Sequence, residues 1–360
     1  QESCIMKKSI LAIAVAATMA APAAMAAPTV YGNVHLSLNA ADNDVPAADN
    51  NLRVSSNTSA IGVKGSEDLG DGLKAIYKME FQVAVGTGPE TEPDAAGALN
   101  GEPGGLSGRD QFMGLKGGFG TVKFGTMSSN YKQMGGKVDP LYRTPLEGRG
   151  FLGTQSSLHG GKGINKGRMT HAVQYTSPKM GGIALVANTT FSGANDETMG
   201  LGLRYGAKAF SVYADWIDFQ LANLNADGEF VAIQPDCNVA NNCDMGTAIK
   251  VGGQFDADAF SVALQYEMID TGEWKSDIDY IFAAGTFNIN KNNSVILTYG
   301  MTSVDVDSGD PSADTDGVAV AYNHNMSKMT NVYVGYGAKS NDLNYAQGGG
   351  DESMLTAGMR

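Results

Sequence analysis

The sequence predicts an all-β fold, a transmembrane antiparallel β-barrel of about sixteen strands, and three observations support it. Apolar and polar residues alternate with a period of two in segment after segment, which places them on opposite faces of a strand. The links between these segments alternate between short and long. No apolar run of about 18 residues, the length that a transmembrane helix needs, occurs outside the first 30 positions, and no helical period follows residue 26.

The N-terminal 26 residues are predicted to be absent from the mature barrel. Lys7 and Lys8 precede an apolar run, and Ala24-Met25-Ala26 ends it with the small residues that a signal peptidase requires. Residues 1–5 are interpreted as upstream read-through, residues 6–26 as a signal peptide and residues 27–360 as the barrel. The mature chain is therefore expected to lie outside the inner membrane.

The clearest hairpin spans residues 59–81. Gly70 and Gly72 form its tight turn. In the second strand an apolar set that includes Tyr77 alternates with a polar set that includes Lys78 and Glu80. In a membrane barrel the apolar face meets lipid and the charged face meets a wet lumen. An Arg or Lys that faced lipid at mid-depth would cost roughly 2–4 kcal/mol.

The links between the predicted strands place short turns on one rim and long loops on the other. This is the layout of an outer-membrane barrel, with periplasmic turns and extracellular loops, and only the link at residues 192–197 departs from it. The predicted long loops are residues 41–57, 85–108, 126–167, 218–243, 268–277, 302–316 and 339–352.

Charge and composition exclude several classes of function. The net charge of −13 argues against nucleic acid as a partner, because binding phosphate needs clustered Lys and Arg. Cys237 and Cys243 lie in a polar loop, so a disulfide between them is the first interpretation for an exported chain. The four histidines are scattered and show no ligand spacing, so neither a metal site nor a cofactor is expected. No local catalytic motif is present, and the chain is not expected to be an enzyme.

Several short motifs resemble those of the general trimeric porins of Gram-negative bacteria. They are Gly62-Val63-Lys64-Gly65-Ser66-Glu67-Asp68-Leu69-Gly70, Arg109-Asp110-Gln111-Phe112-Met113-Gly114-Leu115, Gly118-Phe119-Gly120-Thr121-Val122 and Tyr175-Thr176-Ser177-Pro178. The resemblance implies a homotrimer in outer-membrane lipid that passes ions and small hydrophilic solutes by passive diffusion. Such porins usually end in an aromatic residue, so the last strand, which stops at Arg360, is interpreted as truncated.

The resemblance also implies that the third long loop, residues 126–167, folds into the lumen and narrows it. Its acids Asp139 and Glu147 are then expected to face cations on the wall. Arg143 and Arg149 lie in the same loop and could point either way, which leaves the sign of ion selectivity open.

Face parity supplies the candidates for the opposing wall, since rings of charged side chains decide which ions pass. Arg109 is expected to share its face with Gln111 and to lie opposite Phe112. The other wall candidates are Arg168, Lys64, Lys78, Glu80 and Asn33. The alternative is that these side chains only solvate a wide lumen. A substrate-selective porin for a sugar or an anion, or a non-conducting adhesin or structural barrel, are the alternative functions.

Overall fold

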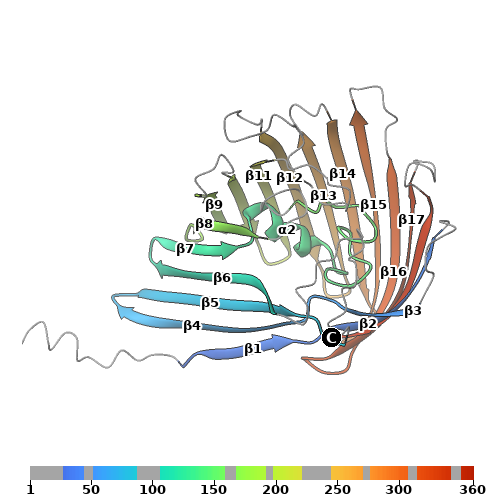
Figure 1. The fold of residues 1–360 in the computed structure, drawn as a ribbon, viewed down its shortest axis with the longest axis horizontal. Coiled ribbons are helices and arrows are strands. Elements are labelled where there is room, and N and C mark those ends of the chain that lie inside the picture. The colour runs from blue at the N-terminus through green and yellow to red at the C-terminus, as the bar shows by residue number, and fades with distance from the viewer. Residues whose placement is uncertain are drawn as a thin grey trace, which may run out of the picture.

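The computed structural model describes residues 27–43, 52–86, 106–158, 168–191, 198–220, 245–270, 276–306, 314–341 and 350–360. Within these ranges, one antiparallel sheet of eighteen strands accompanies the helix α2 (Figure 1). The first nine strands are β1 (Thr29–Asn33), β2 (Leu36–Asn43), β3 (Leu52–Ser56), β4 (Ala60–Gly70), β5 (Leu73–Val83), β6 (Leu106–Gly117), β7 (Gly120–Met127), β8 (Met169–Thr176) and β9 (Ile183–Thr190). The helix α2 (Asn130–Val138) lies between β7 and β8, and the later strands are β10 (Met199–Gly206), β11 (Phe210–Gln220), β12 (Met245–Asp256), β13 (Phe260–Asp270), β14 (Ser276–Asn288), β15 (Asn293–Val306), β16 (Thr315–Asn325), β17 (Asn331–Asn341) and β18 (Glu352–Met359).

Two of the predicted strands are interrupted by one β-bulge. Asn33 pairs with Ala60 and Leu36 pairs with Ser56, so two residues of one strand face three of its neighbour. An extra residue of this kind bends a strand and ends its regular ladder, and Thr58 within the bulge has a positive φ of 55°. β1 and β2 are thus halves of one strand, as are β3 and β4. The described residues thus form eighteen strands where the sequence predicts about sixteen, and β3 lies within the long loop predicted at residues 41–57.

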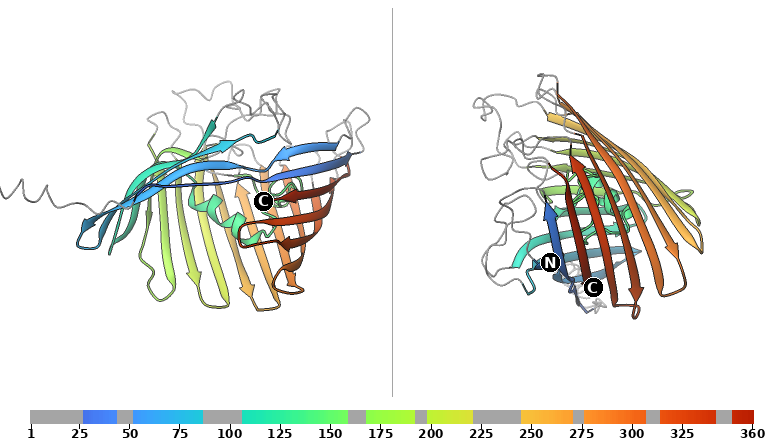
Figure 2. Two further views of the ribbon diagram at one scale, coloured as in Figure 1. Left: turned by 90° about the horizontal axis from the view of Figure 1, so that it is seen from below. Right: turned by 90° about the vertical axis from the view of Figure 1, so that its right-hand side faces the viewer.

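The order of the strands returns to its start. Consecutive strands pair from β4 to β18, and β18 pairs with β2, which in turn pairs with β3. The bulge interrupts the ladder of hydrogen bonds between the first two strands. On one strand it separates β1 from β2, and on the other it separates β3 from β4. Asn57 N still donates to His35 O at 2.8 Å there. The sheet therefore curves around a single interior without an unbroken ladder of hydrogen bonds around it, as two further views show (Figure 2).

The apolar faces of the strands point away from this interior. Val34, Leu203, Val251 and Val320 are exposed over 58%, 45%, 41% and 46% of their surface, respectively. Buried polar side chains such as Gln174 alternate with them on the inner face. This arrangement is the reverse of a soluble sandwich and matches the prediction of an apolar face toward lipid. No helix in the described ranges is long and apolar enough to cross a membrane.

The helix α2 is a second element, besides β3, that the sequence analysis did not predict. The side chain of its N-cap, Ser129, accepts a hydrogen bond from Lys132 N at 3.1 Å. A nine-residue helix that contains Gly135 and Gly136 is marginal in isolation. Its stability comes from contact with β9 to β13, a tertiary effect that leaves no helical period to find.

Several predictions fall outside the described residues. These are the read-through and signal peptide of residues 1–26, the disulfide between Cys237 and Cys243, and most of the long loops. They stay predictions, as does the truncation of the last strand.

Candidate functional site

The segment that follows β7 packs on the concave side of the sheet (Figures 1 and 2). Its Leu146 and Leu152 are buried in one cluster with Ile296, Ala319 and other inward residues of β15 and β16. Apolar burial of this kind is the main favourable contribution that can hold a loop against a wall. The loop therefore folds into the interior, as the resemblance implies.

Glycines on the inner face of β17 make room for this loop. A Cβ on Gly335 would lie 2.9 Å from Leu146 Cδ1, and one on Gly337 would lie 2.8 Å from Leu146 Cδ2. Both distances are shorter than a carbon–carbon contact. The side chain of Leu146 thus occupies a socket that only residues without a side chain leave open.

A buried ion pair anchors the same segment to the strands. Lys250 of β12 and Glu267 of β13 are cross-strand partners, and Lys250 Nζ lies 3.3 Å from Glu267 Oε2. Tyr131 of α2 donates its hydroxyl to Glu267 Oε2 at 2.9 Å and accepts from Lys250 Nζ through its carbonyl oxygen at 3.2 Å. Ser156 N donates to Glu267 Oε1 at 3.2 Å. Because each buried charge has several partners, the anchor fixes both ends of the loop segment.

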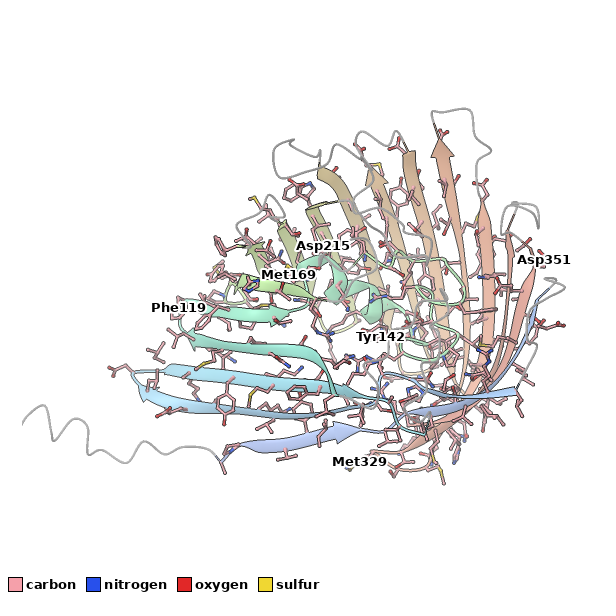
Figure 3. All side chains as sticks on the ribbon, viewed as in Figure 1. Phe119, Tyr142, Met169, Asp215, Met329 and Asp351 are labelled. Atoms are coloured by element: carbon pink, nitrogen blue, oxygen red, sulfur yellow. The ribbon has the colours of Figure 1, made fainter. Side chains whose placement is uncertain are left out.

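A second polar contact holds the first turn of α2. Asn130 Nδ2 donates to Asp215 Oδ1 at 2.9 Å, and Arg204 Nη2 donates to the same oxygen at 2.7 Å. Arg204 Nη2 also donates to Asn130 O at 3.0 Å. Asp215 lies beside α2 on the inner face of the strands (Figure 3).

On β5, β6 and the start of β8, five charged side chains form the wall cluster, defined as Lys78, Glu80, Arg109, Asp110 and Arg168. Arg109 Nε lies 2.7 Å from Glu80 Oε1, and Lys78 Nζ lies 2.9 Å from both Glu80 Oε2 and Asp110 Oδ2. Arg168 pairs with Asp110 through its Nε. Four of the predicted wall residues are therefore brought together, and Asp110 joins them.

A second β-bulge explains why Asp110 was missed. Met79 pairs with Gln111 and Phe81 pairs with Gly108, so Glu80 faces both Arg109 and Asp110. The bulge reverses the face parity of the rest of β6. Phe112 consequently pairs with Lys78 and packs inward on Met127, Met169 and Ala172. The prediction that Phe112 lies opposite the face of Arg109 was wrong for this reason.

The remaining wall candidates lie beside this cluster. Lys64 is the cross-strand partner of Lys78, and its ammonium lies 4.9 Å from the ring centroid of Tyr31. Tyr31 donates its hydroxyl to Glu80 Oε2 at 2.8 Å. Asn33 donates through Nδ2 to the carbonyl oxygen of Thr58 in the first bulge, at 3.4 Å.

The two loop acids bind the backbone of the loop itself. Asp139 is buried and accepts from Leu141 N and Gly148 N, both at 2.8 Å. Burial raises the pKa of Asp139 to about 7, although these backbone hydrogen bonds oppose the shift. Glu147 accepts from Arg143 N at 2.7 Å. Their carboxylates order the turns that follow α2.

Two of the loop cations lie against the ring of Tyr142. Arg143 and Arg149 stack on Tyr142, with guanidinium-to-centroid distances of 5.3 and 5.1 Å. Burial, together with Arg168, Arg149 and Arg109, lowers the pKa of Lys132 on α2 to about 6. Lys132 is therefore close enough to the wall cluster to feel its charge. The neck is defined here as the region between the wall cluster and the loop cations Lys132, Arg143 and Arg149.

The residues that anchor the loop were not singled out from the sequence. One signal could have found them: opposite charges at Lys250 and Glu267, in the middle of neighbouring strands. The small inward residues of β16 and β17, such as Ala319 and Gly335, mark where the loop packs. In the described ranges, no three His, Cys, Asp or Glu side chains converge as a metal site would require.

Comparison with known families and proteins places this geometry among outer-membrane proteins. The family described as Gram-negative porin matches residues 12–344. Major outer membrane protein P.IB of Neisseria gonorrhoeae is 31% identical over 214 residues, which are 57% of this chain and 55% of that protein. The chain thus spans about half the length of this relative. A monosaccharide porin of a Halomonas species is 26% identical over 307 residues, covering 79% of this chain and 75% of that protein.

Solved structures share the fold at low sequence identity. The anion-selective porin from Comamonas acidovorans has a TM-score of 0.70 at 19% identity, covering 92% of this chain and 98% of that one. The trimer form of OmpT, an outer membrane protein of Vibrio cholerae, has a TM-score of 0.61 at 16% identity, covering 92% and 99%. These likenesses show a common architecture.

Proposed function

The chain belongs to the Gram-negative porin family and is an outer-membrane protein, and we propose that it forms a water-filled channel for passive diffusion of ions and small hydrophilic solutes. The observation that carries the proposal is the neck, where charged side chains from the wall and from an inward-folded loop face one region. Rings of charged groups at a constriction select among the solutes that enter. The proposed role of this site is to select among permeating solutes, and no chemical reaction is proposed there.

The charges at the neck support a preference for anions. Three cations of the wall cluster, together with Arg143 and Arg149, exceed the carboxylates of Glu80, Asp110 and Glu147, although the chain as a whole carries −13. Lys132 adds a further positive charge only at low pH. Asp139 is turned into the loop backbone and contributes little to the neck. Local charge, and not the net charge, sets the potential that a permeating ion meets.

A planar-bilayer recording tests both parts of the proposal. We expect a large steady conductance and, in a salt gradient, a reversal potential displaced toward that of the anion. A silent bilayer containing folded protein would instead favour a structural barrel or an adhesin. A reversal potential displaced toward the cation would reject the anion preference and leave the channel standing.

The oligomeric state proposed is a homotrimer embedded in outer-membrane lipid. The trimeric OmpT structure with the same fold supports it. Chemical cross-linking in detergent should stop at a three-chain product, and a product limited to one chain would count against the trimer.

A sugar-selective channel is the second candidate, because the Halomonas relative is a monosaccharide porin. The discriminating measurement is the current in the presence of glucose. A saturable block by glucose would favour this candidate, whereas a general channel shows none.

A further inference from the structure

Three lysines share the inner wall between the wall cluster and the short turns of β4 to β7. Lys74 of β5 and Lys116 of β6 are directly opposed cross-strand partners. Lys123 of β7 is paired with Gly114. Lys74 and Lys78 lie four residues apart on one strand, and side chains alternate between faces, so this lysine patch (Lys74, Lys116 and Lys123) lies on the same inner face as the neck.

The three ammonium groups lie outside ion-pair distance of any carboxylate of the described residues, although Asp110 of the wall cluster acts on Lys123 electrostatically. Within the described ranges none of them forms an ion pair, in contrast to Lys78, Arg109 and Arg168, which all do. Asp68 is the cross-strand partner of Lys74, but its carboxylate accepts from Gly70 N at 3.0 Å. Lys123 Nζ lies 5.1 Å from the ring centroid of Phe112.

This arrangement works against the stability of the sheet. Like charges directly opposite each other in an antiparallel pair are destabilising, and both Lys74/Lys116 and Lys64/Lys78 are pairs of this kind. The side chain of Lys123 also depends on Gly114, since a Cβ there would lie 3.2 Å from Lys123 Cγ. Apart from Asp68, which is opposite Lys74, and Asp110, which acts on Lys123, no carboxylate of the described residues balances the charge of the patch.

We propose that the lysine patch is a binding site for small multivalent oxyanions, of the phosphate class, on the short-turn side of the neck. Opposed residues of an antiparallel pair have Cβ atoms about 4.5–5.5 Å apart, so the flexible stems of Lys74 and Lys116 reach one dianion together. Lys123 lies one pair further along the neighbouring strand and supplies a third charge. Lysine binds phosphate as a point charge. A monovalent anion gains less electrostatic energy than a dianion from each contact with such a charge.

The inference rests on the proposed channel. It adds a second group of cations to the route of an anion, between the neck and the short-turn rim. An anion that leaves the paired charges of the neck meets unpaired cations before it reaches the short-turn rim. A multivalent anion is held there long enough to obstruct the chloride current.

The test is a single-channel recording in dilute potassium chloride with inorganic phosphate added as the probe. We expect phosphate to reduce the chloride current saturably, and nitrate, a monovalent oxyanion, to reduce it far less. The variant K74Q/K116Q/K123Q should weaken the apparent phosphate affinity about tenfold, the size expected for three solvent-exposed ionic contacts. K208Q/K291Q removes two lysines from short turns at the same rim and should leave the affinity within about twofold.

The outcomes separate the inference from the proposed channel. Absence of conductance in the parent protein would reject the channel. Normal conductance without a phosphate effect, or a phosphate effect that survives in the triple variant, would overturn the lysine patch alone. Conductance in about 1 M salt, where fixed charges are screened within roughly 3 Å, reports whether each variant still forms an intact pore.

Discussion

Two regions of the inner wall use the same chemistry in opposite surroundings. Beneath the loop, Lys250 and Glu267 pair with their side chains 1% and 0% exposed. Across the neck, Lys78 and Asp110 pair with their side chains 23% and 22% exposed. The first pair is dry and fixes a segment of chain, whereas the second is wet and presents charge to the lumen.

The difference in water determines what each pair can do. Removal of one partner of a buried pair leaves an uncompensated charge and is strongly destabilising. Solvent-exposed pairs contribute little to stability because water and salt screen them. We therefore expect the dry wall to set the geometry of the proposed constriction and the wet wall to set its electrostatics.

The largest effect is expected when the dry pair is broken. Lys250→Met should lower the free energy of unfolding by about 3–5 kcal/mol, because Glu267 is left buried without its cation. The helix α2 also loses the hydrogen bond from Lys250 to Tyr131 O, so conductance should rise as the loop detaches. Unfolding in detergent, followed by circular dichroism, and single-channel conductance measure the two effects.

Lys78→Met is the matched control on the wet wall and should change stability by about 0–1 kcal/mol. Equal losses of stability in the two variants would contradict the distinction between a dry and a wet wall.

A smaller effect is expected from the apolar contact of the same dry wall. Leu146→Ala leaves a cavity between the loop and β17 and should destabilise the docked loop by roughly 3 kcal/mol. Leu264→Ala deletes the same atoms from a side chain that is 66% exposed on the outer face, where lipid can fill the space. Current noise from a mobile loop should increase only in Leu146→Ala.

The alternation of residues predicted the barrel but only part of the neck. Glu80 and Lys78 lie on a regular strand, so parity placed them correctly on the inner face. Parity failed on β6, where the bulge at Arg109 and Asp110 turns Phe112 inward and Gln111 to the other face. The alternation of residues with a period of two does not reveal where a bulge inserts an extra residue into a strand.

The docking of the loop could not be derived from local sequence either. Asp139 looks like an acid available to the lumen, yet two backbone amides of its own loop bind it. Only the folded loop brings Leu141 and Gly148 to one carboxylate. The identity of the loop as an inward segment came from resemblance, and its anchor at Lys250 and Glu267 came from the structure.

The wall cluster is tested by removal of its arginines, whose side chains are only 7% and 11% exposed, so both selectivity and stability should fall. At about 8 Å in water with about 0.1 M salt, one charge alters the energies of a passing anion and cation by roughly 0.25 kcal/mol in opposite senses, which changes the permeability ratio about twofold. Arg109→Ala with Arg168→Ala should therefore lower the anion-to-cation permeability ratio about fourfold. Reversal potential in a salt gradient is the measurement, and an unchanged value would show that the neck lies elsewhere.

The smallest effect is a pH dependence at Lys132, a loop cation whose pKa responds to the charges of the wall cluster. Burial and the charges of Arg168, Arg149 and Arg109 lower its pKa to about 6, while Asp110 acts in the opposite sense. A group with this pKa is mostly neutral at pH 7.5 and mostly protonated at pH 5. The neck thus gains one positive charge as the pH falls, and the anion preference should increase by up to about twofold. Lys132→Gln should abolish most of this change.

Protonation of Asp139, whose pKa is about 7, acts in the same direction but from within the loop backbone, so Asp139→Asn should leave the step near pH 6 in place. If the step persisted in Lys132→Gln and vanished in Asp139→Asn, the charge that senses pH would belong to the loop interior, and α2 would not present a cation to the wet wall.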